Sequence, residues 1–191
     1  TFNETENYNS AVNDNAKVTV DKGTPNISDV KAADIYYPND VVVNITTDTP
    51  GTYTVKIGNA TKEVNLIAGK NSVNITGVTP GKDQVVNVTF NETENYTSAV
   101  NDNAKVTVDK ATPNISKVNA TDSVYPEDVV VNITTDTPGT YIIKIGNTTK
   151  EVNLTAGENT VNITGVTPGK DQVVNVTFKE TENYTSVVND N

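Results

Sequence analysis

The chain has 191 residues and a formal net charge of −10, because 24 acidic side chains outweigh 14 basic ones, all of them lysine. Cysteine and histidine are absent, which excludes zinc sites, iron–sulfur sites and Cys–His or Ser–His nucleophiles. The acidic balance and the lack of arginine also argue against a nucleic-acid partner, since phosphate binding needs clustered positive charge. We therefore expect a protein that is not an enzyme, with no catalytic residue and no resident cofactor.

No apolar run approaches the roughly 18 residues of a membrane-spanning helix, so we expect no membrane-spanning segment in this piece. No signal peptide is visible either. The sequence opens on Thr1 in the middle of a repeat, so we expect any targeting segment to lie outside it.

The sequence repeats itself with a period of 88 residues. The octapeptide Thr-Phe-Asn-Glu-Thr-Glu-Asn-Tyr begins at Thr1 and again at Thr89, and a variant of it begins at Thr177. When residues 1–88 are aligned with residues 89–176, 14 of the 88 positions differ. Copies this similar indicate a unit that is used many times, which suits a structural protein better than a unique active site.

The boundaries between units are predicted near Gly23 and Ala111. Each lies in a segment of the form Val-Thr-Val-Asp-Lys-x-Thr-Pro-Asn-Ile, which indicates a last strand, a tight joint and a first strand. Proline fixes one backbone angle and biases its neighbour to an extended form. The prediction is therefore C-terminal strands of a preceding repeat at 1–22, a complete domain at 24–110 and a domain lacking its last strand at 112–191.

Apolar and polar residues alternate with a period of two in the complete domain, which is typical of half-buried strands. In chain order, the predicted strands lie near 26–30, 41–46, 53–57, 64–66, 73–75, 86–90 and 106–108. Turn sequences such as Asp48-Thr49-Pro50-Gly51 separate them, and no segment has a convincing helical period. About seven short strands predict an all-β, immunoglobulin-like sandwich that lacks the Cys–Trp–Cys core of antibody domains.

The inward positions of this alternation define a predicted core of aliphatic residues and phenylalanine. In the complete domain and its copy, these residues are Val43, Ile45, Val55, Ile57, Leu66, Ile75, Val88, Phe90, Val131, Ile133, Ile143, Ile145, Leu154, Ile163, Val176 and Phe178. A solvent-exposed Phe90 or Phe178 would contradict the prediction.

The sequence from Val85 to Ala99, followed by Ala104 to Pro113, resembles bacterial-type immunoglobulin-like domain repeats. In that family an aromatic strand leads into an acidic Asn-Tyr loop, and a Thr/Val strand then ends in Lys-x-Thr-Pro. Such repeats are abundant in adhesin-like surface proteins of methanogenic archaea and some bacteria. The resemblance covers essentially the whole chain and implies an extracellular location, at the cell surface or in a secreted filament. It does not discriminate among stalks, spacers and adhesive modules.

Asn-x-Ser/Thr sequences, the acceptors of N-linked glycans, are unusually dense. The 28 asparagines and 38 serines and threonines form 16 of them, and strand alternation alone explains only part of this excess. The alternation places Asn44, Asn74 and Asn87 on the solvent face, where a glycan must project. We predict glycans at several sites, with Asn44, Asn74, Asn132 and Asn162 as first choices. The full predicted set is Asn3, Asn26, Asn44, Asn59, Asn74, Asn87, Asn91, Asn95, Asn114, Asn119, Asn132, Asn147, Asn153, Asn162, Asn175 and Asn183.

The loop Glu92–Tyr96 carries the acidic and aromatic cluster that is most like a binding site. The alternative, which we favour, is that Tyr96 caps the end of the core while the acidic side chains stay solvated. Calcium between domains is a second alternative, because carboxylates suit that ion, although no Asp-x-Asp-x-Asp-Gly loop is present. The aspartates concerned, all near one joint, are Asp21, Asp29, Asp34 and Asp40.

Two hypotheses for function remain. The first is a structural repeat of an N-glycosylated extracellular stalk or filament, in which neighbouring copies contact one another head to tail. The alternative is an adhesive module that binds glycans or proteins of a host or partner cell. The unusual aromatic pair Tyr36-Tyr37 becomes Val124-Tyr125 in the next copy, which argues against a repeated binding pocket.

Residues 112–191 contain six of the seven predicted strands, and the missing one corresponds to 104–110. Residues 16–22 have the same sequence as that strand. Either the chain is a piece of a longer continuous one, or each subunit donates its first strand to the open domain of the next. The first explanation is favoured, because residues 177–191 nearly duplicate 1–15. Both predict an extended head-to-tail rod.

Overall fold

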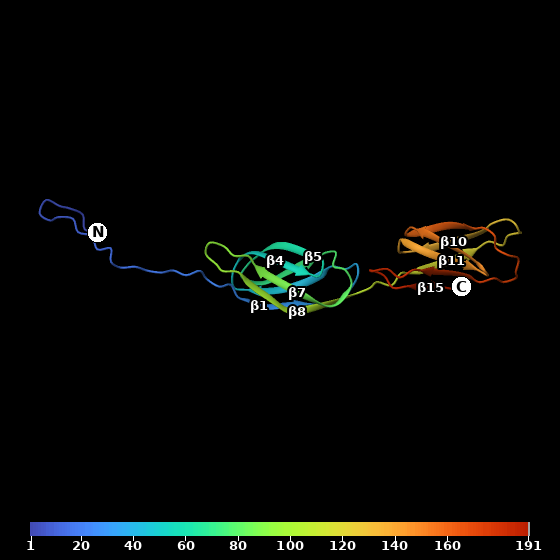
Figure 1. The fold of residues 1–191 in the computed structure, drawn as a ribbon, viewed down its shortest axis with the longest axis horizontal. Helices are drawn as coiled ribbons and strands as arrows, with labels where there is room; N and C mark the ends of the chain where they lie inside the picture. Colours follow the sequence, from blue (N-terminus) through green and yellow to red (C-terminus); the bar gives the residue numbers. More distant parts are fainter. Residues whose placement is uncertain (191) are drawn as a thin grey trace.

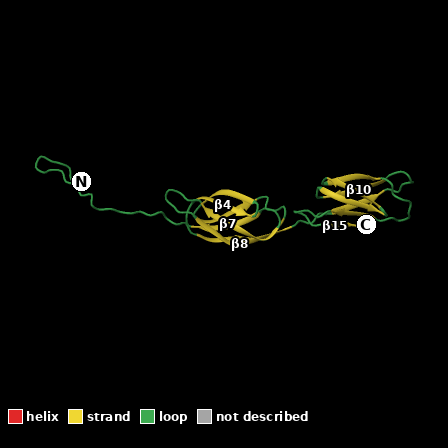
Figure 2. Cartoon of the chain, in the orientation of Figure 1, coloured by secondary structure: helices red, strands yellow, loops and turns green. Residues whose placement is uncertain are grey.

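The structure, a computed structural model, describes residues 1–190, and every regular element in that range is a β-strand (Figure 2). Asn191, the last residue of the predicted C-terminal domain, lies outside the described residues. The all-β prediction is thereby confirmed for the described chain. The strands collect into two groups that follow one another along the chain (Figure 1).

The first group lies between residues 27 and 109. Its strands are β1 (Ile27–Ala32), β2 (Ile35–Tyr36), β3 (Val41–Thr47), β4 (Gly51–Ile57), β5 (Ala60–Leu66), β6 (Gly69–Ile75), β7 (Gly81–Phe90) and β8 (Ala99–Asp109). They form a three-stranded sheet in the order β1-β3-β6 and a five-stranded sheet in the order β2-β8-β7-β4-β5. The pairing of β2 with β8 is parallel, and the other ladders of this group are antiparallel.

The second group repeats most of this arrangement, without a counterpart of β2 among the described strands. Its strands are β9 (Ile115–Ala120), β10 (Val129–Thr135), β11 (Gly139–Ile145), β12 (Thr148–Leu154), β13 (Gly157–Ile163), β14 (Val174–Phe178) and β15 (Val187–Asn189). Their sheets have the orders β13-β10-β9 and β12-β11-β14-β15. Strands β9 to β13 each begin 88 residues after their counterparts, whereas β14 has 5 residues against 10 in β7.

Every predicted core residue is buried, Phe90 and Phe178 included. Each group has its own core cluster, and each cluster draws on both of its sheets. Val43 in β3 and Val55 in β4, for example, belong to different sheets of the first group and share one cluster. Two sheets that enclose a common apolar core are consistent with a β-sandwich.

Gly51 opens β4 beneath the ring of Phe90. Its φ angle is +155°, and a Cβ atom built on it would lie 2.7 Å from Phe90 Cε2. Gly139 and Phe178 repeat this geometry, with the same 2.7 Å separation. The Pro-Gly turn therefore places its glycine where the core ring leaves no space for a side chain.

Residues 1–22 lie outside both strand groups (Figure 1). Isolated bridges between Phe2 and Ala11 and between Thr5 and Tyr8 close a loop in the first part of this segment. Val18 and Val20, in the predicted last strand of a preceding repeat, are 87% and 88% exposed. In the described part of the chain, no strand ladder covers these two valines.

Candidate functional site

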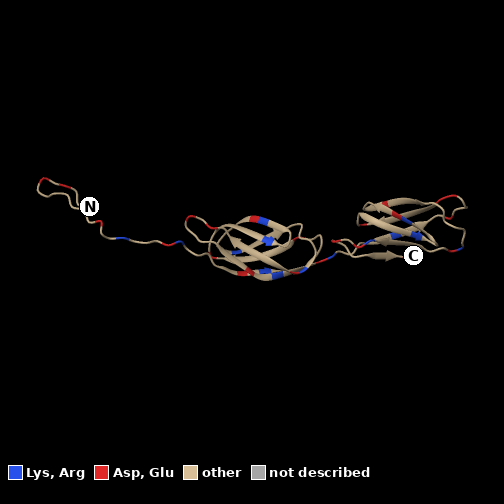
Figure 3. Cartoon of the chain, in the orientation of Figure 1, with Lys and Arg blue, Asp and Glu red and all other residues tan. Residues whose placement is uncertain are grey.

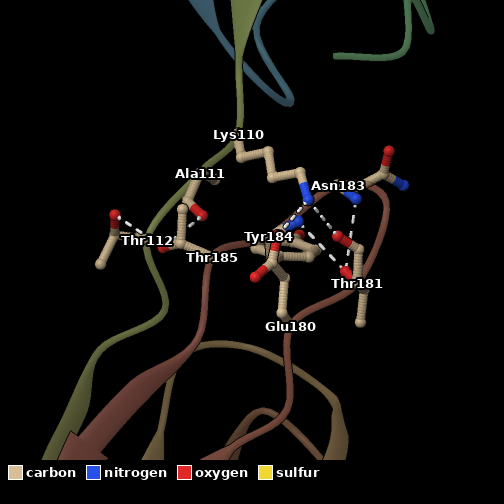
Figure 4. Close-up of polar contacts among 8 residues, drawn as sticks. All are labelled: Lys110, Ala111, Thr112, Glu180, Thr181, Asn183, Tyr184 and Thr185. Atoms are coloured by element: carbon tan, nitrogen blue, oxygen red, sulfur yellow. Dashed lines mark hydrogen bonds and ion pairs between the residues drawn. The ribbon is translucent and has the colours of Figure 1, made fainter. Parts of the chain in front are cut away.

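The acidic and aromatic loop of the second unit holds the chain segment that enters that unit (Figure 4). Lys110 Nζ lies 2.5 Å from Glu180 Oε1 and donates a second hydrogen bond to the Thr181 carbonyl oxygen at 2.8 Å. Lysine carries three donors on a flexible stem, so one ammonium group can satisfy a carboxylate and a carbonyl together. The loop thereby binds the last side chain of the connecting segment.

The backbone that follows Lys110 is held as well. The Ala111 N–H group donates to the Asn183 carbonyl oxygen at 3.0 Å, and the Ala111 carbonyl oxygen accepts from the Thr185 N–H group at 2.9 Å. The Thr185 hydroxyl group donates to the Thr112 hydroxyl oxygen at 3.2 Å. We call this set of contacts, from Lys110–Thr112 to the loop 180–185, the second joint.

The same contacts form where the chain enters the first unit. Lys22 Nζ lies 2.6 Å from Glu92 Oε1 and donates to the Thr93 carbonyl oxygen at 2.9 Å. The Gly23 N–H group donates to the Asn95 carbonyl oxygen at 3.0 Å. We call these contacts, from 22–24 to the loop 92–97, the first joint. The change from glycine to alanine between the two copies leaves the geometry intact.

Aromatic rings connect the second joint to both cores. The Tyr184 ring lies 6.0 Å from Phe178, which in turn lies 5.1 Å from Tyr141. On its other side, Tyr184 meets the ring of Tyr37, in the first unit, at 5.6 Å and an interplanar angle of 86°. Edge-to-face packing of this kind stabilises aromatic pairs beyond their buried area. Burial raises the pKa of the Tyr184 hydroxyl group above its ordinary value.

Tyr96 holds the equivalent position in the first unit, where its ring lies 6.0 Å from Phe90. Its ring contacts the core through Phe90 but remains 37% exposed, so it covers the end of the core only in part. Glu92 is exposed but also ion-paired, which sequence reasoning missed. The hydrogen bond from Lys22, and secondly its charge, lower the pKa of the Glu92 carboxyl group. The equal separation of 70 residues in both copies only reflects the repeat, so the sequence offered no signal for this contact.

The structure places most of the predicted glycan acceptors on the surface. The exposed ones are Asn3, Asn26, Asn44, Asn59, Asn74, Asn91, Asn95, Asn114, Asn119, Asn132, Asn147, Asn153 and Asn162, whereas Asn87, Asn175 and Asn183 are half-buried. The four first choices are all exposed, whereas Asn87, which the alternation also placed on the solvent face, is half-buried.

Two of the acceptor side chains are less available than the sequence suggested. The Asn59 side chain accepts from the Thr79 N–H group and donates to the Gly77 carbonyl oxygen, so it is part of a turn. Asn183 Oδ1 is buried at the second joint without a hydrogen-bond partner. A glycan on either residue would displace these packed groups.

Two of the four aspartates proposed as calcium ligands have other contacts. Asp29 pairs with Lys31 at 3.0 Å, and Asp34 Oδ1 accepts from the Thr107 N–H group at 2.7 Å. Within residues 1–190, no three acidic side chains gather as a metal site would require. The structure therefore adds no support to the calcium alternative.

Both signs of charge are spread along the chain rather than collected on one face (Figure 3). Residues 1–190 include no helix that is long and apolar enough to cross a membrane. No protein-family model and no curated protein matches the chain. A proposal for its function therefore rests on the repeat, on the exposed acceptor sites and on the two joints.

Proposed function

We propose that this chain is a structural segment of an extracellular cell-surface stalk or filament. Its units are immunoglobulin-like sandwiches at 24–110 and 112–191, preceded by the last strands of another repeat at 1–22. They belong with the bacterial-type repeats of adhesin-like surface proteins, which the sequence resembles. The protein has no catalytic role, and neighbouring copies of the repeat contact one another head to tail.

The observation that carries this proposal is the joint, which forms twice with equivalent atoms. Domains linked by a free connector normally move relative to one another. Here an ion pair and two backbone hydrogen bonds hold the connector against the loop of the following unit. At the second joint, the ring of Tyr184 also contacts the preceding unit through Tyr37. If such a joint is repeated, each unit follows the preceding one in the same orientation. A rod requires this regular orientation.

The adhesive alternative has less support. Tyr37, one member of the unusual aromatic pair, packs in the second joint and is not free to bind a ligand. Tyr36 is 63% exposed, but its counterpart in the next copy is Val124. An adhesive repeat would present the same exposed aromatic group in each copy.

The proposed extracellular location can be tested through the glycans. Mass spectrometry of protein from the native source should find N-linked sugar on several sequons, with Asn44, Asn74, Asn132 and Asn162 occupied more often than Asn59 and Asn183. We expect the higher occupancy at the four exposed sites because an exposed side chain accepts a glycan without displacing packed atoms. Native material in which every sequon peptide is unmodified would contradict the proposal.

The rod can be tested by small-angle X-ray scattering on residues 1–191. We expect two elongated units at a narrow distribution of separations. Tyr37→Ala should broaden this distribution, because it removes the ring that meets Tyr184. The matched control, Tyr125→Ala, changes the equivalent residue of the second unit, whose ring meets no following unit in the described chain. Two units packed side by side, or no difference between the variants, would overturn the rod.

A further inference from the structure

The chain enters and leaves the first unit at opposite ends of that unit (Figure 1). Between these points, its first and last strands lie against each other: β1 and β8 are in contact although they belong to different sheets. We call residues 23–37 the entry segment and residues 95–109 the exit segment. A pull on the chain reaches these two segments before any other part of the unit.

Hydrogen bonds join the two segments at the end where the chain enters. The Gly23 N–H group donates to the Asn95 carbonyl oxygen at 3.0 Å, and the Thr97 N–H group donates to the Gly23 carbonyl oxygen at 2.9 Å. The bridge that they form is parallel. Further along, Asn101 Nδ2 donates to the Ile27 carbonyl oxygen at 2.8 Å. The start of the entry segment is therefore bound to the start of the exit segment.

The same two segments are joined again at the far end of the unit. Asp34 Oδ1 accepts a hydrogen bond from the Thr107 N–H group at 2.7 Å, and the Tyr37 N–H group donates to the Asp109 carbonyl oxygen at 2.9 Å. Beside these bonds, β2 pairs with β8 as a short parallel ladder. The separation in sequence is 74 residues at the Asn101 contact and 73 residues at the Thr107 contact. The two segments are therefore parallel and keep a nearly constant register.

Parallel end segments determine how the unit responds to tension. A pull on Gly23 from one end and on Lys110 from the other slides the entry segment along the exit segment. Since a hydrogen bond is lost beyond about 3.5 Å, contacts that are stretched together must also break together. Antiparallel end segments would have both pulled ends on the same side, so their contacts would separate one after another.

We propose that each unit is a tension clamp, in which load passes from the entry segment directly to the exit segment and on into the next connector. This function goes beyond the proposed stalk or filament, because a spacer can hold two surfaces apart without carrying tension. The second unit repeats the contacts near its entry. Ala111 bonds to Asn183 and Thr185, and Asn189 Nδ2 donates to the Ile115 carbonyl oxygen at 3.0 Å.

The first experiment stretches residues 1–191 by single-molecule force spectroscopy in two geometries. One handle is attached at the N-terminus, and the other at a single introduced cysteine, since the chain has none of its own. Thr112→Cys loads the first unit alone and slides its end segments. Glu94→Cys, next to Asn95 at the entry end, peels the entry segment away. Both positions are exposed, so neither substitution should disturb folding.

We expect the sliding geometry to require at least about twice the force of the peeling geometry, because the short-range contacts then share the load. Equal rupture forces in the two geometries would overturn the clamp. If the forces are equal while scattering still shows two units in a rod, only this inference is wrong and the proposed function stands.

The second experiment removes contacts of the clamp. Asp34→Ala/Asn101→Ala loses one hydrogen bond near each end, and circular dichroism will verify that it folds. In the sliding geometry it should unfold at least about tenfold faster at constant force, because forced unfolding follows the unfolding rate and two hydrogen bonds contribute to its barrier.

The matched control is Asn59→Ala. Its side chain bonds to the backbone of Gly77 and Thr79, outside both segments, so its loss should weaken the unit in urea but leave the rate under sliding force near that of the wild type. A clamp variant that unfolds under force no faster than this control would contradict the proposal.

Discussion

Tyr53 and Tyr141 carry a hydroxyl group into each core, where an unpaired polar group is costly. The Tyr53 hydroxyl group donates to the Thr49 carbonyl oxygen at 2.7 Å and lies 2.6 Å from Thr47 Oγ1. Burial raises the pKa of Tyr53, so the hydroxyl group keeps its proton. Thr47 and Thr49 are buried polar residues for this reason: they satisfy the tyrosine at the β3–β4 turn.

Removal of this hydroxyl group should destabilise the first unit. Tyr53→Phe leaves the Thr47 hydroxyl group and the Thr49 carbonyl oxygen short of a buried partner, at an expected loss of about 1–3 kcal/mol in unfolding free energy. Urea unfolding followed by circular dichroism measures it. The control is Tyr36→Phe, whose exposed ring should show no change. A Tyr53→Phe variant as stable as the control would show that the buried hydrogen bonds contribute nothing.

The ion pair at the first joint should depend on pH. Lys22 lowers the pKa of Glu92 in the folded chain. The stabilisation is therefore fully present above the ordinary glutamate pKa of about 4.3 and is lost as the pH falls through the lower, folded pKa. An NMR titration of the Glu92 carboxyl carbon should give a higher pKa in Lys22→Gln than in the wild type. Lys17→Gln, on the same segment, should leave it unchanged, and an equal shift in both variants would rule out a specific pair.

At the scale of strands, the sheet edges are protected by charge. Strand β5 is the edge of the five-stranded sheet, and Lys62 lies opposite the buried Val55, on the inner face. Its ammonium group reaches across the open side of the two sheets to donate to the Asn74 carbonyl oxygen in β6 at 3.0 Å. Lys150 and Asn162 repeat the contact. A charge facing inward on an edge strand discourages pairing with another sheet.

Loss of these lysines should allow lateral association. Lys62→Val/Lys150→Val leaves two β-prone edges without their charges, so light scattering should detect large particles at concentrations where the wild type shows none. The matched control is Lys56→Val/Lys144→Val, because β4 and β11 have partners on both sides. Aggregation of both double variants alike would assign the effect to net charge rather than to the edge.

At the scale of the whole molecule, the two units share a pattern, of which the described residues hold less in the second unit than in the first. The valines Val106 and Val108 of the first core have no counterpart in the second among the described residues. Each buried valine contributes about 1.5–3 kcal/mol, so in a polypeptide cut to residues 1–191 we expect the second unit to be less stable than the first by roughly 3–6 kcal/mol.

Amide hydrogen exchange on the polypeptide of residues 1–191 tests this difference. Amides of β14 should exchange faster than those of β7 by at least about tenfold, because the second unit opens at lower free energy. A synthetic peptide of residues 104–110, which include Val106 and Val108, should restore their protection. Equal exchange in β7 and β14 without peptide would contradict the expected gap in stability.

The 88-residue period and the inward face of each long strand could be predicted from the sequence alone. Alternation with a period of two is a local property, so Val43, Val55 and Phe90 are identifiable as core residues without knowledge of the fold. The same alternation placed Asn44 and Asn74 on the solvent face, where the structure also has them. The Pro-Gly turns could be predicted because proline and glycine favour the backbone angles that turns require.

Only the tertiary structure decided how distant parts of the chain meet. Nothing local indicates that Lys110 binds a loop 70 residues later or that Tyr37 meets Tyr184. The order of strands in the sheets and the hydrogen bonds of Thr107 with Asp34 and Asp83 likewise depend on contacts between residues far apart in sequence. Periodicity indicates which face of a strand is buried. A joint forms between loops, which have no periodicity, so its contacting residues are known only from the folded structure.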